Sequence, residues 1–398
     1  MQAFKFKLKT KTKQAQCLWR FAGSCRYVFN QALKLQKSRY EQGEKKLSYA
    51  GLCDMLTQWK QTPKTQWLNN APSQSLQQSL KNLDRAYQNF FSKRAHFPQF
   101  KKRGVRDAFR YPQGFKLDQI RSRIYLPKIG WIKYFNSQTV LGKIKNITVS
   151  QRAGAWYVSI QTEKEVSTPV HANRDIVAID VGIAKFAVLS TKQTYAGCHA
   201  LKEKLNRLKH EQRQLSKKVK FSQNWLKQKR IVSRLHYQIS NTRLDYLHKT
   251  SHDISKNHAM IVLEDLQIKN MSKSSAGTMD MPGKKVKIKS GLNRSILDQG
   301  WYEFRRQLSY KTKWLGGDVI LVNSQYTSQT CPIPDCRHVS KENRKTQADF
   351  NCVACGFKEN ADYVGSLNIL AAGHAVLACG EKVQLGHSVK QEPNRIVA

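Results

Sequence analysis

The sequence predicts a multidomain α/β protein, and three observations support this. The chain has 398 residues, more than one ordinary core uses, and 40% of them are hydrophobic, which is enough for folding. Helical periodicity up to about residue 108 gives way to short alternating segments, and from residue 174 apolar strands alternate with long helices. Three of these later elements carry an acidic residue where the element ends or begins.

The first part of the chain predicts a strand, a helical layer and a small β-barrel. In residues 1–12 lysines alternate with Phe4, Phe6 and Leu8, which indicates a half-buried strand with one cationic face. Residues 13–108 carry apolar residues at helical spacing. Residues 109–173 consist of short alternating runs separated by Gly, Pro and Asn, so we predict a β-barrel-like module that the first strand completes.

The remainder, residues 174–398, is predicted to be an α/β domain. Apolar runs at 176–180 and 260–264 indicate buried strands, with 186–190 as a hairpin partner of the first. Two long charged helices are expected between 199 and 258. The pattern then predicts a mobile loop over 267–292, a single helix over 294–314, a strand over 319–322 and a final helix from about residue 361.

The charge balance points to a polyanionic partner. The chain has 69 Lys and Arg against 27 Asp and Glu, a formal net charge of +42. Such an excess destabilises a compact state unless it is neutralised, and phosphate contacts do so with release of counterions. A solvated basic surface or a membrane-surface protein is the alternative, but the basic residues run through the whole chain, which favours nucleic acid.

The sequence also predicts a cytoplasmic protein. No apolar run reaches the ~18 residues of a membrane span, and the N-terminus lacks the continuous apolar core of a signal peptide.

Three acids are candidate metal ligands. Asp180 and Glu264 each end an apolar strand, and Asp362 begins an apolar helix. An ionised carboxylate at the end of a buried strand is unfavourable without a cation, and phosphodiester hydrolysis by two Mg²⁺ ions uses such oxygen ligands. Any one of these acids alone could be a turn residue. Asp265, beside Glu264, should face the other side of its strand.

Four of the nine cysteines cluster and predict a structural Zn²⁺ site. Cys331 and Cys336 form one pair, and Cys352 and Cys355 form a second, so that two turns supply four thiolates. Four protein ligands leave no open position for catalysis. Free buried thiols are the alternative, and His338 is a conceivable substitute ligand.

The order of these elements is similar to a ribonuclease-H-like fold. Residues 179–182, 262–266 and 360–369 resemble the three RuvC motifs. Over essentially its whole length, including residues 326–331, the chain resembles the TnpB (OrfB) family of transposon-encoded proteins, relatives of the type V CRISPR effectors. One position departs from the family, because Val364 stands where the third motif usually carries Asn, whereas Asn368 is present.

The resemblance implies an RNA-guided DNA endonuclease with a RuvC-like domain over 174–398, a zinc-ribbon insertion over 327–358, a helical recognition domain over 13–108 and a wedge-like barrel over 109–173 completed by 1–12. It implies Asp180, Glu264 and Asp362 as catalytic Mg²⁺ ligands. The implied partners are a guide RNA from the transposon end and double-stranded target DNA with a short adjacent motif, bound by one copy of the chain. Two alternatives stay open: a nuclease-inactive RNA-guided repressor, and a transposase accessory protein that acts without RNA.

Overall fold

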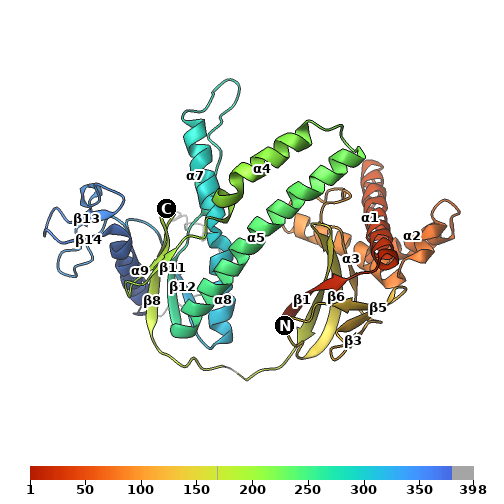
Figure 1. The fold of residues 1–398 in the computed structure, drawn as a ribbon, viewed down its shortest axis with the longest axis horizontal. Coiled ribbons are helices and arrows are strands. Elements are labelled where there is room, and N and C mark those ends of the chain that lie inside the picture. The colour runs from red at the N-terminus through yellow and green to blue at the C-terminus, as the bar shows by residue number, and fades with distance from the viewer. Residues whose placement is uncertain (168, 379–398) are drawn as a thin grey trace, which may run out of the picture. The chain divides into compact units, whose positions relative to one another are not determined.

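A computed structural model describes residues 1–167 and 169–378. Its contacts divide the chain into two units, Met1–Val166 and Ser167–Ala398, each of which is described by itself (Figure 1). The predicted end of the last domain, residues 379–398, lies outside the described residues. No helix within the described ranges is both long and apolar enough to cross a membrane.

The first unit contains a seven-stranded antiparallel sheet in the order β2-β6-β7-β1-β5-β4-β3. The strands are β1 (Gln2–Lys9), β2 (Ala108–Tyr111), β3 (Lys116–Asp118), β4 (Arg123–Leu126), β5 (Gly130–Tyr134), β6 (Lys143–Arg152) and β7 (Ala155–Glu163). The first strand of the chain therefore lies inside the sheet formed by the later segments, between β7 and β5. Phe4, Phe6 and Leu8 are buried as the alternation predicts, and the intervening lysines are exposed.

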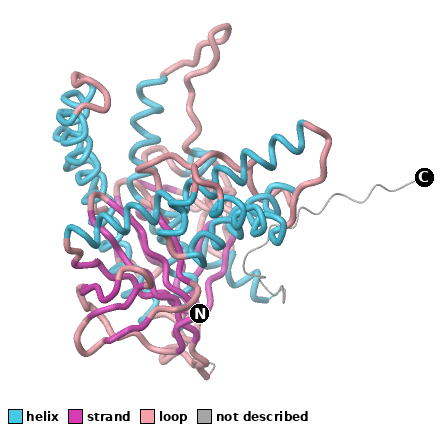
Figure 2. The backbone as a smooth tube through the Cα atoms, turned by 90° about the vertical axis from the view of Figure 1, so that its right-hand side faces the viewer, coloured by secondary structure: helices cyan, strands magenta, loops and turns pink. Residues whose placement is uncertain are grey.

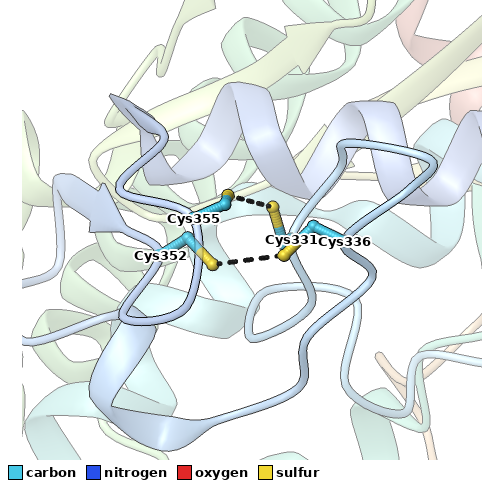
Figure 3. Close-up of side chains that lie close together, drawn as sticks. All are labelled: Cys331, Cys336, Cys352 and Cys355. Carbon is cyan, nitrogen blue, oxygen red and sulfur yellow. Dashed lines mark hydrogen bonds between the residues drawn. The ribbon is translucent and has the colours of Figure 1, made fainter.

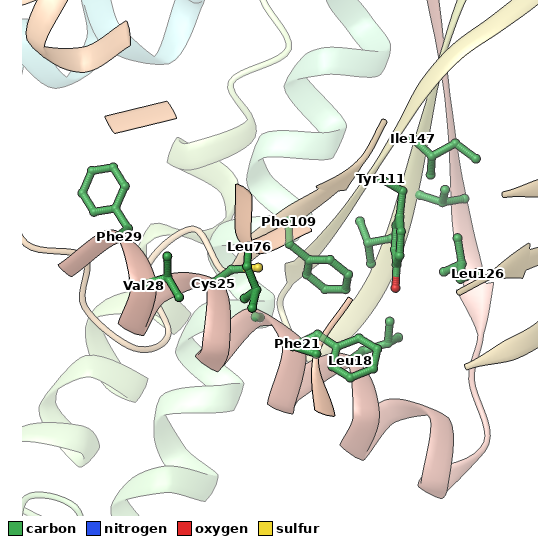
Figure 4. Packing of buried hydrophobic residues seen from close by; sticks show 14 of the residues in the cluster. Leu18, Phe21, Cys25, Val28, Phe29, Leu76, Phe109, Tyr111, Leu126 and Ile147 are labelled. Atoms are coloured by element: carbon green, nitrogen blue, oxygen red, sulfur yellow. The ribbon is translucent and has the colours of Figure 1, made fainter. Parts of the chain in front are cut away.

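Helices cover this sheet and share its core. They are α1 (Thr12–Glu41), α2 (Tyr49–Gln61) and α3 (Ser73–Phe91), with a short 3₁₀ helix, η1 (Gln66–Asn70). Figure 4 shows Leu18, Phe21 and Cys25 of α1 close to Leu76 of α3 and Phe109 of β2. A continuous apolar core therefore joins the helices to the strands.

The second unit contains a five-stranded sheet in the order β10-β9-β8-β11-β12. The strands are β8 (Ile176–Val181), β9 (Lys185–Leu189), β10 (Thr194–Ala196), β11 (Met260–Glu264) and β12 (Asp318–Val322). The strands β8, β11 and β12 run parallel, whereas β9 and β10 form an antiparallel meander with β8. Since parallel strands end at the same edge, the acids that close β8 and β11 lie at one edge of the sheet.

Successive residues of these strands face two different helical layers. The helices of the second unit are α4 (Ala200–Ser216), α5 (Gln223–Asn257), α6 (Ile268–Met271), α7 (Val286–Gln299), α8 (Trp301–Trp314) and α9 (Ala361–Ala378). Ile179 and Leu263 pack with α5, α7 and α8, whereas Ala178 and Val262 pack with Ile369 of α9 on the opposite face. Side chains two residues beyond Ala178 and Val262 therefore point to the α9 face.

Two predicted elements differ in the structure. The helix predicted over 294–314 is two helices, because Gly300 adopts a left-handed φ of 76° between α7 and α8. A side chain at Gly300 would also come within 3.1 Å of Arg243 on α5. The loop predicted over 267–292 contains α6 and the start of α7, and only the segment between them projects as a long loop (Figures 1 and 2). A composition rich in Lys and Ser did not distinguish an exposed helix from a loop.

Candidate active site

Asp180 and Glu264 are neighbours at the carboxyl edge of the parallel strands. Leu263 is paired with Ile179, so the next residues along β11 and β8 are these two acids. Asp180 lies two residues after Ala178, and Glu264 two residues after Val262, so both acids point to the same face as these residues, toward α9. Asp265 points to the other face, where it forms an ion pair with Arg305 of α8. Strand alternation thus separates two adjacent acids into different environments.

The third acid is brought to this edge by α9. Asp362 lies in the first turn of the helix, and Gly365 follows three residues later on the same side. A Cβ atom at Gly365 would lie 3.0 Å from the Oδ2 atom of Asp180, and one at Gly373 would lie 2.6 Å from a methyl group of Val262. The two glycines allow the helix to lie directly on the strands, which brings Asp362 close enough for its charge to act on Asp180.

The surroundings of the two strand acids raise the pKa of both. Burial, followed by the negative charges of Glu264 and Asp362, raises the pKa of Asp180 to about 7. Burial also raises the pKa of Glu264. None of the three is fully buried, and the Asp362 side chain keeps 24% of its surface exposed. A partly open cluster of carboxylates that lacks enough positive charge fits a site for hard divalent cations such as Mg²⁺.

A hydrogen-bonded chain joins Glu264 to α9. The Thr327 hydroxyl donates to Oε1 of Glu264 at 2.6 Å. The side-chain amide of Asn368 donates to the carbonyl oxygens of Thr327 and Thr330 at 2.8 and 2.7 Å. Arg337 in turn donates to Oδ1 of Asn368 at 3.0 Å. Thr327 therefore fixes the Glu264 carboxylate while Asn368 fixes Thr327 to the helix that carries the third acid.

Arg344 brings a positive charge to the acids. The Arg344 guanidinium lies 3.3 Å from Oδ1 of Asp362, and the same nitrogen donates to the carbonyl oxygen of Gln347 at 2.8 Å. Its positive charge also lowers the pKa of Asp180, against the larger effect of burial. Arg344 comes from the cysteine-containing segment, so this segment contributes charge directly to the carboxylate cluster.

The four clustered cysteines belong to the segment that follows β12 and precedes α9 in the sequence, and Figure 3 shows their side chains close together. The Sγ atoms of Cys331, Cys336, Cys352 and Cys355 all lie within 4.8 Å of one another. Cys331 and Cys355 are 3.6 Å apart, and Cys336 and Cys352 are 3.7 Å apart. A tetrahedral Zn²⁺ with Zn–S bonds of ~2.3 Å requires S–S separations of about 3.8 Å, whereas a disulfide requires about 2.05 Å. The cluster therefore fits a four-thiolate zinc site.

The surroundings act in opposite directions on two of the cysteines. Burial raises the pKa of Cys331 to about 12, so that this thiol needs a cation to ionise. Burial also acts on Cys352, but hydrogen bonds from the backbone amides of Cys355 and Ala354 and from neighbouring thiols together lower its pKa to about 7. A 3₁₀ turn, η2 (Lys341–Asn343), and a small hairpin of β13 (Asp349–Asn351) and β14 (Lys358–Asn360) complete the segment. Val364 of α9 is buried against it, beside Phe350.

Three known sequence families match parts of the chain. One described as "Probable transposase" matches residues 159–275, one described as "Cas12f1-like, TNB domain" matches residues 301–369, and one described as "Helix-turn-helix domain" matches residues 1–45.

Whole-length relatives decide the family. A protein of Escherichia coli K12 named "Putative RNA-guided DNA endonuclease InsQ" is 57% identical over 397 residues, covering 100% of this chain and 98% of its own length. The chain belongs to the TnpB (OrfB) family. A Streptomyces pristinaespiralis protein named "Putative RNA-guided DNA endonuclease" is 32% identical over 415 residues, covering 100% of this chain and 97% of its own length. A Sulfoacidibacillus thermotolerans "CRISPR-associated endodeoxyribonuclease Cas12f1" is 28% identical over 228 residues, 55% of this chain and 50% of that protein.

The match described as "Helix-turn-helix domain" has an informative local structure. Residues 1–45 of this TnpB chain form β1 followed by α1, which is one uninterrupted helix of 30 residues. Residues 1–45 therefore do not contain the two helices that the description "Helix-turn-helix domain" implies.

The structure of this TnpB protein also adds residues that sequence reasoning missed. Thr327, Arg344 and Gly365 all touch a predicted ligand, but each does so only through the tertiary fold. Gly365 offered the one available signal, because a glycine inside an apolar helix is unfavourable unless close packing needs it.

Proposed function

We propose that this TnpB chain is an RNA-guided DNA endonuclease whose catalytic residues are Asp180, Glu264 and Asp362. The observation that supports the assignment is the meeting of these three carboxylates, from two adjacent parallel strands and one helix, at a single sheet edge. The net charge of +42 supports RNA and DNA as partners. The E. coli relative, which matches over the whole chain, carries the same activity in its name.

The chain's residues have distinct roles in this proposal. Divalent ions held by the three carboxylates would supply an activated water and stabilise the leaving oxygen during phosphodiester hydrolysis, and Mg²⁺ suits the all-oxygen ligand set. Thr327 orients Glu264 through its hydroxyl group. The Arg344 guanidinium, which lies 3.3 Å from Asp362, would contact a phosphate oxygen in place of this acid when nucleic acid is bound.

The proposed layout assigns a RuvC-like domain to residues 174–398, with a zinc-ribbon insertion at 327–358. Residues 13–108 would be the recognition layer, and residues 109–173 with 1–12 the wedge-like module. The cysteine segment would hold a structural Zn²⁺, because its four thiolates complete a tetrahedral set. In this arrangement the guide RNA reads the target by base pairing and the protein reads duplex shape and a short adjacent motif.

The test starts with the protein expressed beside its flanking transposon DNA. RNA that copurifies is sequenced, and a matched duplex is incubated with the complex and Mg²⁺. We expect cleavage that is lost in Asp180→Asn, with RNA and target binding retained. Asp265→Asn is the matched control, because that acid points away from the site. Target binding without Mg²⁺-dependent cleavage by the wild-type complex would support the repressor alternative and overturn the nuclease.

A second candidate function has one observation in its favour. The family matched over residues 159–275 is described as a transposase, an enzyme that would act on transposon ends itself. Ribonuclease treatment of the purified protein separates the two. Guided cleavage stops when the RNA is removed, whereas a transposase that needs no RNA keeps its activity on transposon-end DNA.

A further inference from the structure

The helices α4 and α5 form a hairpin that extends away from the sheet of the second unit (Figure 1). Near the sheet α5 is part of the main core, with Leu247 and Ile254 against the strands. Farther out the two helices share only a small apolar seam that includes Leu208, Val232 and Leu235. The outer part of the hairpin therefore contributes little to the core of the domain and presents most of its surface to solvent.

The outer hairpin carries a large and unpaired positive charge. Between residues 200 and 236 there are twelve Lys and Arg side chains but only two acids. Among the described residues none of these twelve cations forms an ion pair. Closer to the sheet the opposite holds, since Arg243 pairs with Asp298 at 2.6 Å. The unpaired cations repel one another and need a polyanion for neutralisation.

The tip of the hairpin holds an aromatic pair. Phe221 is 70% exposed and has a φ of 70°, a left-handed conformation that bulky residues rarely adopt. Its ring centroid lies 5.5 Å from that of Trp225, the first aromatic residue of α5. Lys220 lies over the Phe221 ring at 5.4 Å, and Lys229 lies over the Trp225 ring at 4.9 Å. The fold thus holds two rings at a solvent-exposed turn between lysines.

We propose that this tip binds unpaired nucleotides of an RNA, with a base stacked on Phe221 and Trp225 and the neighbouring phosphates on the lysines. Bases in RNA loops and single strands are unstacked and available to aromatic side chains. A continuous DNA duplex keeps its base faces covered and would use only the lysines. The proposal rests on the proposed function, because the guide RNA is the natural source of such nucleotides.

The experiment uses the full-length protein freed of RNA and a short uridine RNA that contains 4-thiouridine. After irradiation the protein is digested with trypsin and the nucleotide adducts are mapped. Cleavage after Lys220 and Lys227 releases residues 221–227 as one peptide, so an adduct on this peptide reports on the tip alone. Binding to other basic surfaces of the chain gives adducts on other peptides and does not interfere.

Phe221→Gly is the main variant, because glycine adopts the observed φ without strain and the unfolding midpoint should stay equal or rise. We expect the RNA concentration for half-maximal adduct formation on residues 221–227 to increase about 5- to 100-fold. Phe221→Trp should retain the wild-type value, since it keeps a stacking surface. Phe91→Ala, which removes another exposed ring, is the control and should leave the adduct unchanged.

Two outcomes would overturn the proposal. One is the absence of an adduct on residues 221–227 while other peptides react. The other is an adduct that an unlabelled DNA duplex of the same length displaces as well as unlabelled single-stranded RNA does, because the tip would then recognise charge only. Neither outcome depends on target cleavage, so a failure of the proposed nuclease is scored separately by the Mg²⁺ assay.

Discussion

Replacing Thr327 with valine should weaken the proposed catalytic metal site without disturbing the fold. Valine has nearly the shape of threonine but lacks the hydroxyl group that donates to Glu264 at 2.6 Å. The backbone carbonyl of residue 327 keeps its bond from Asn368, so the path of the chain should not change. The variant therefore removes one charged hydrogen bond and leaves the carboxylate free to rotate away from the metal.

The magnitude follows from the type of bond. A hydrogen bond to a charged group contributes about 2 kcal/mol, which corresponds to ~30-fold in an equilibrium constant. Loss of groups that orient metal ligands typically lowers metal affinity or activity by about 10- to 100-fold. We therefore expect Thr327→Val to raise the half-saturating Mg²⁺ concentration for target cleavage ~30-fold, with much of the rate recovered at high Mg²⁺.

The assay is a Mg²⁺ titration of target cleavage, with Mn²⁺ binding followed by electron paramagnetic resonance as a readout that does not need turnover. Thr327→Ser keeps the hydroxyl and should resemble the wild type. Thr330→Val is the matched control, because the Thr330 hydroxyl bonds to the carbonyl oxygen of Tyr326 and not to an acid. If Thr327→Val and Thr330→Val have equal Mg²⁺ requirements, the orienting role of Thr327 is refuted.

Three further predictions concern packing, zinc and pH. Gly365→Ala should reduce cleavage at least ~10-fold by displacing Asp180, whereas Gly373→Ala should mainly lower the unfolding midpoint; equal effects on both properties would contradict this. A Zn²⁺-selective chelator at saturating Mg²⁺ should abolish cleavage, and added Zn²⁺ should restore the wild type but not Cys355→Ser, as metal analysis would verify. Burial lowers the pKa of Lys311 from 10.5 to about 8, so the unfolded chain binds more protons between these values and stability should rise with pH there; denaturant unfolding of Lys311→Met should lack this rise.

The sequence was most informative where several residues of one chemical type occur in a pattern that favours one kind of site. An acid after a buried apolar strand needs a cation or donors, and two cysteine pairs on turns suit one metal. The sheet indeed sets Asp180 beside Glu264, and the four Sγ atoms do converge. These features follow from local sequence patterns and from the rule that parallel strands end at the same edge of a sheet, and both can be applied to one sequence without an alignment.

Other features could not be predicted because they arise from contacts between distant segments. Thr327 lies 63 residues from Glu264 and Arg344 lies 18 residues from Asp362, and neither spacing has a local signature. Gly300 is an ordinary helix residue by pattern until α5 is known to pass beside it. The aromatic tip at Phe221 was likewise hidden, since its exposure and backbone conformation follow from how the two helices meet.

The position of α9 has a consequence for how the protein is made. Asp362 belongs to the last described element of the chain, and most of the Lys and Arg residues come earlier in the sequence. A ribosome that stops before this helix releases a product with two of the three carboxylates and with most of the positive charge. Under the proposed function such a product would occupy nucleic acid without cutting it. Under the proposed function, the residue that completes the catalytic set is therefore synthesised after most of the basic residues.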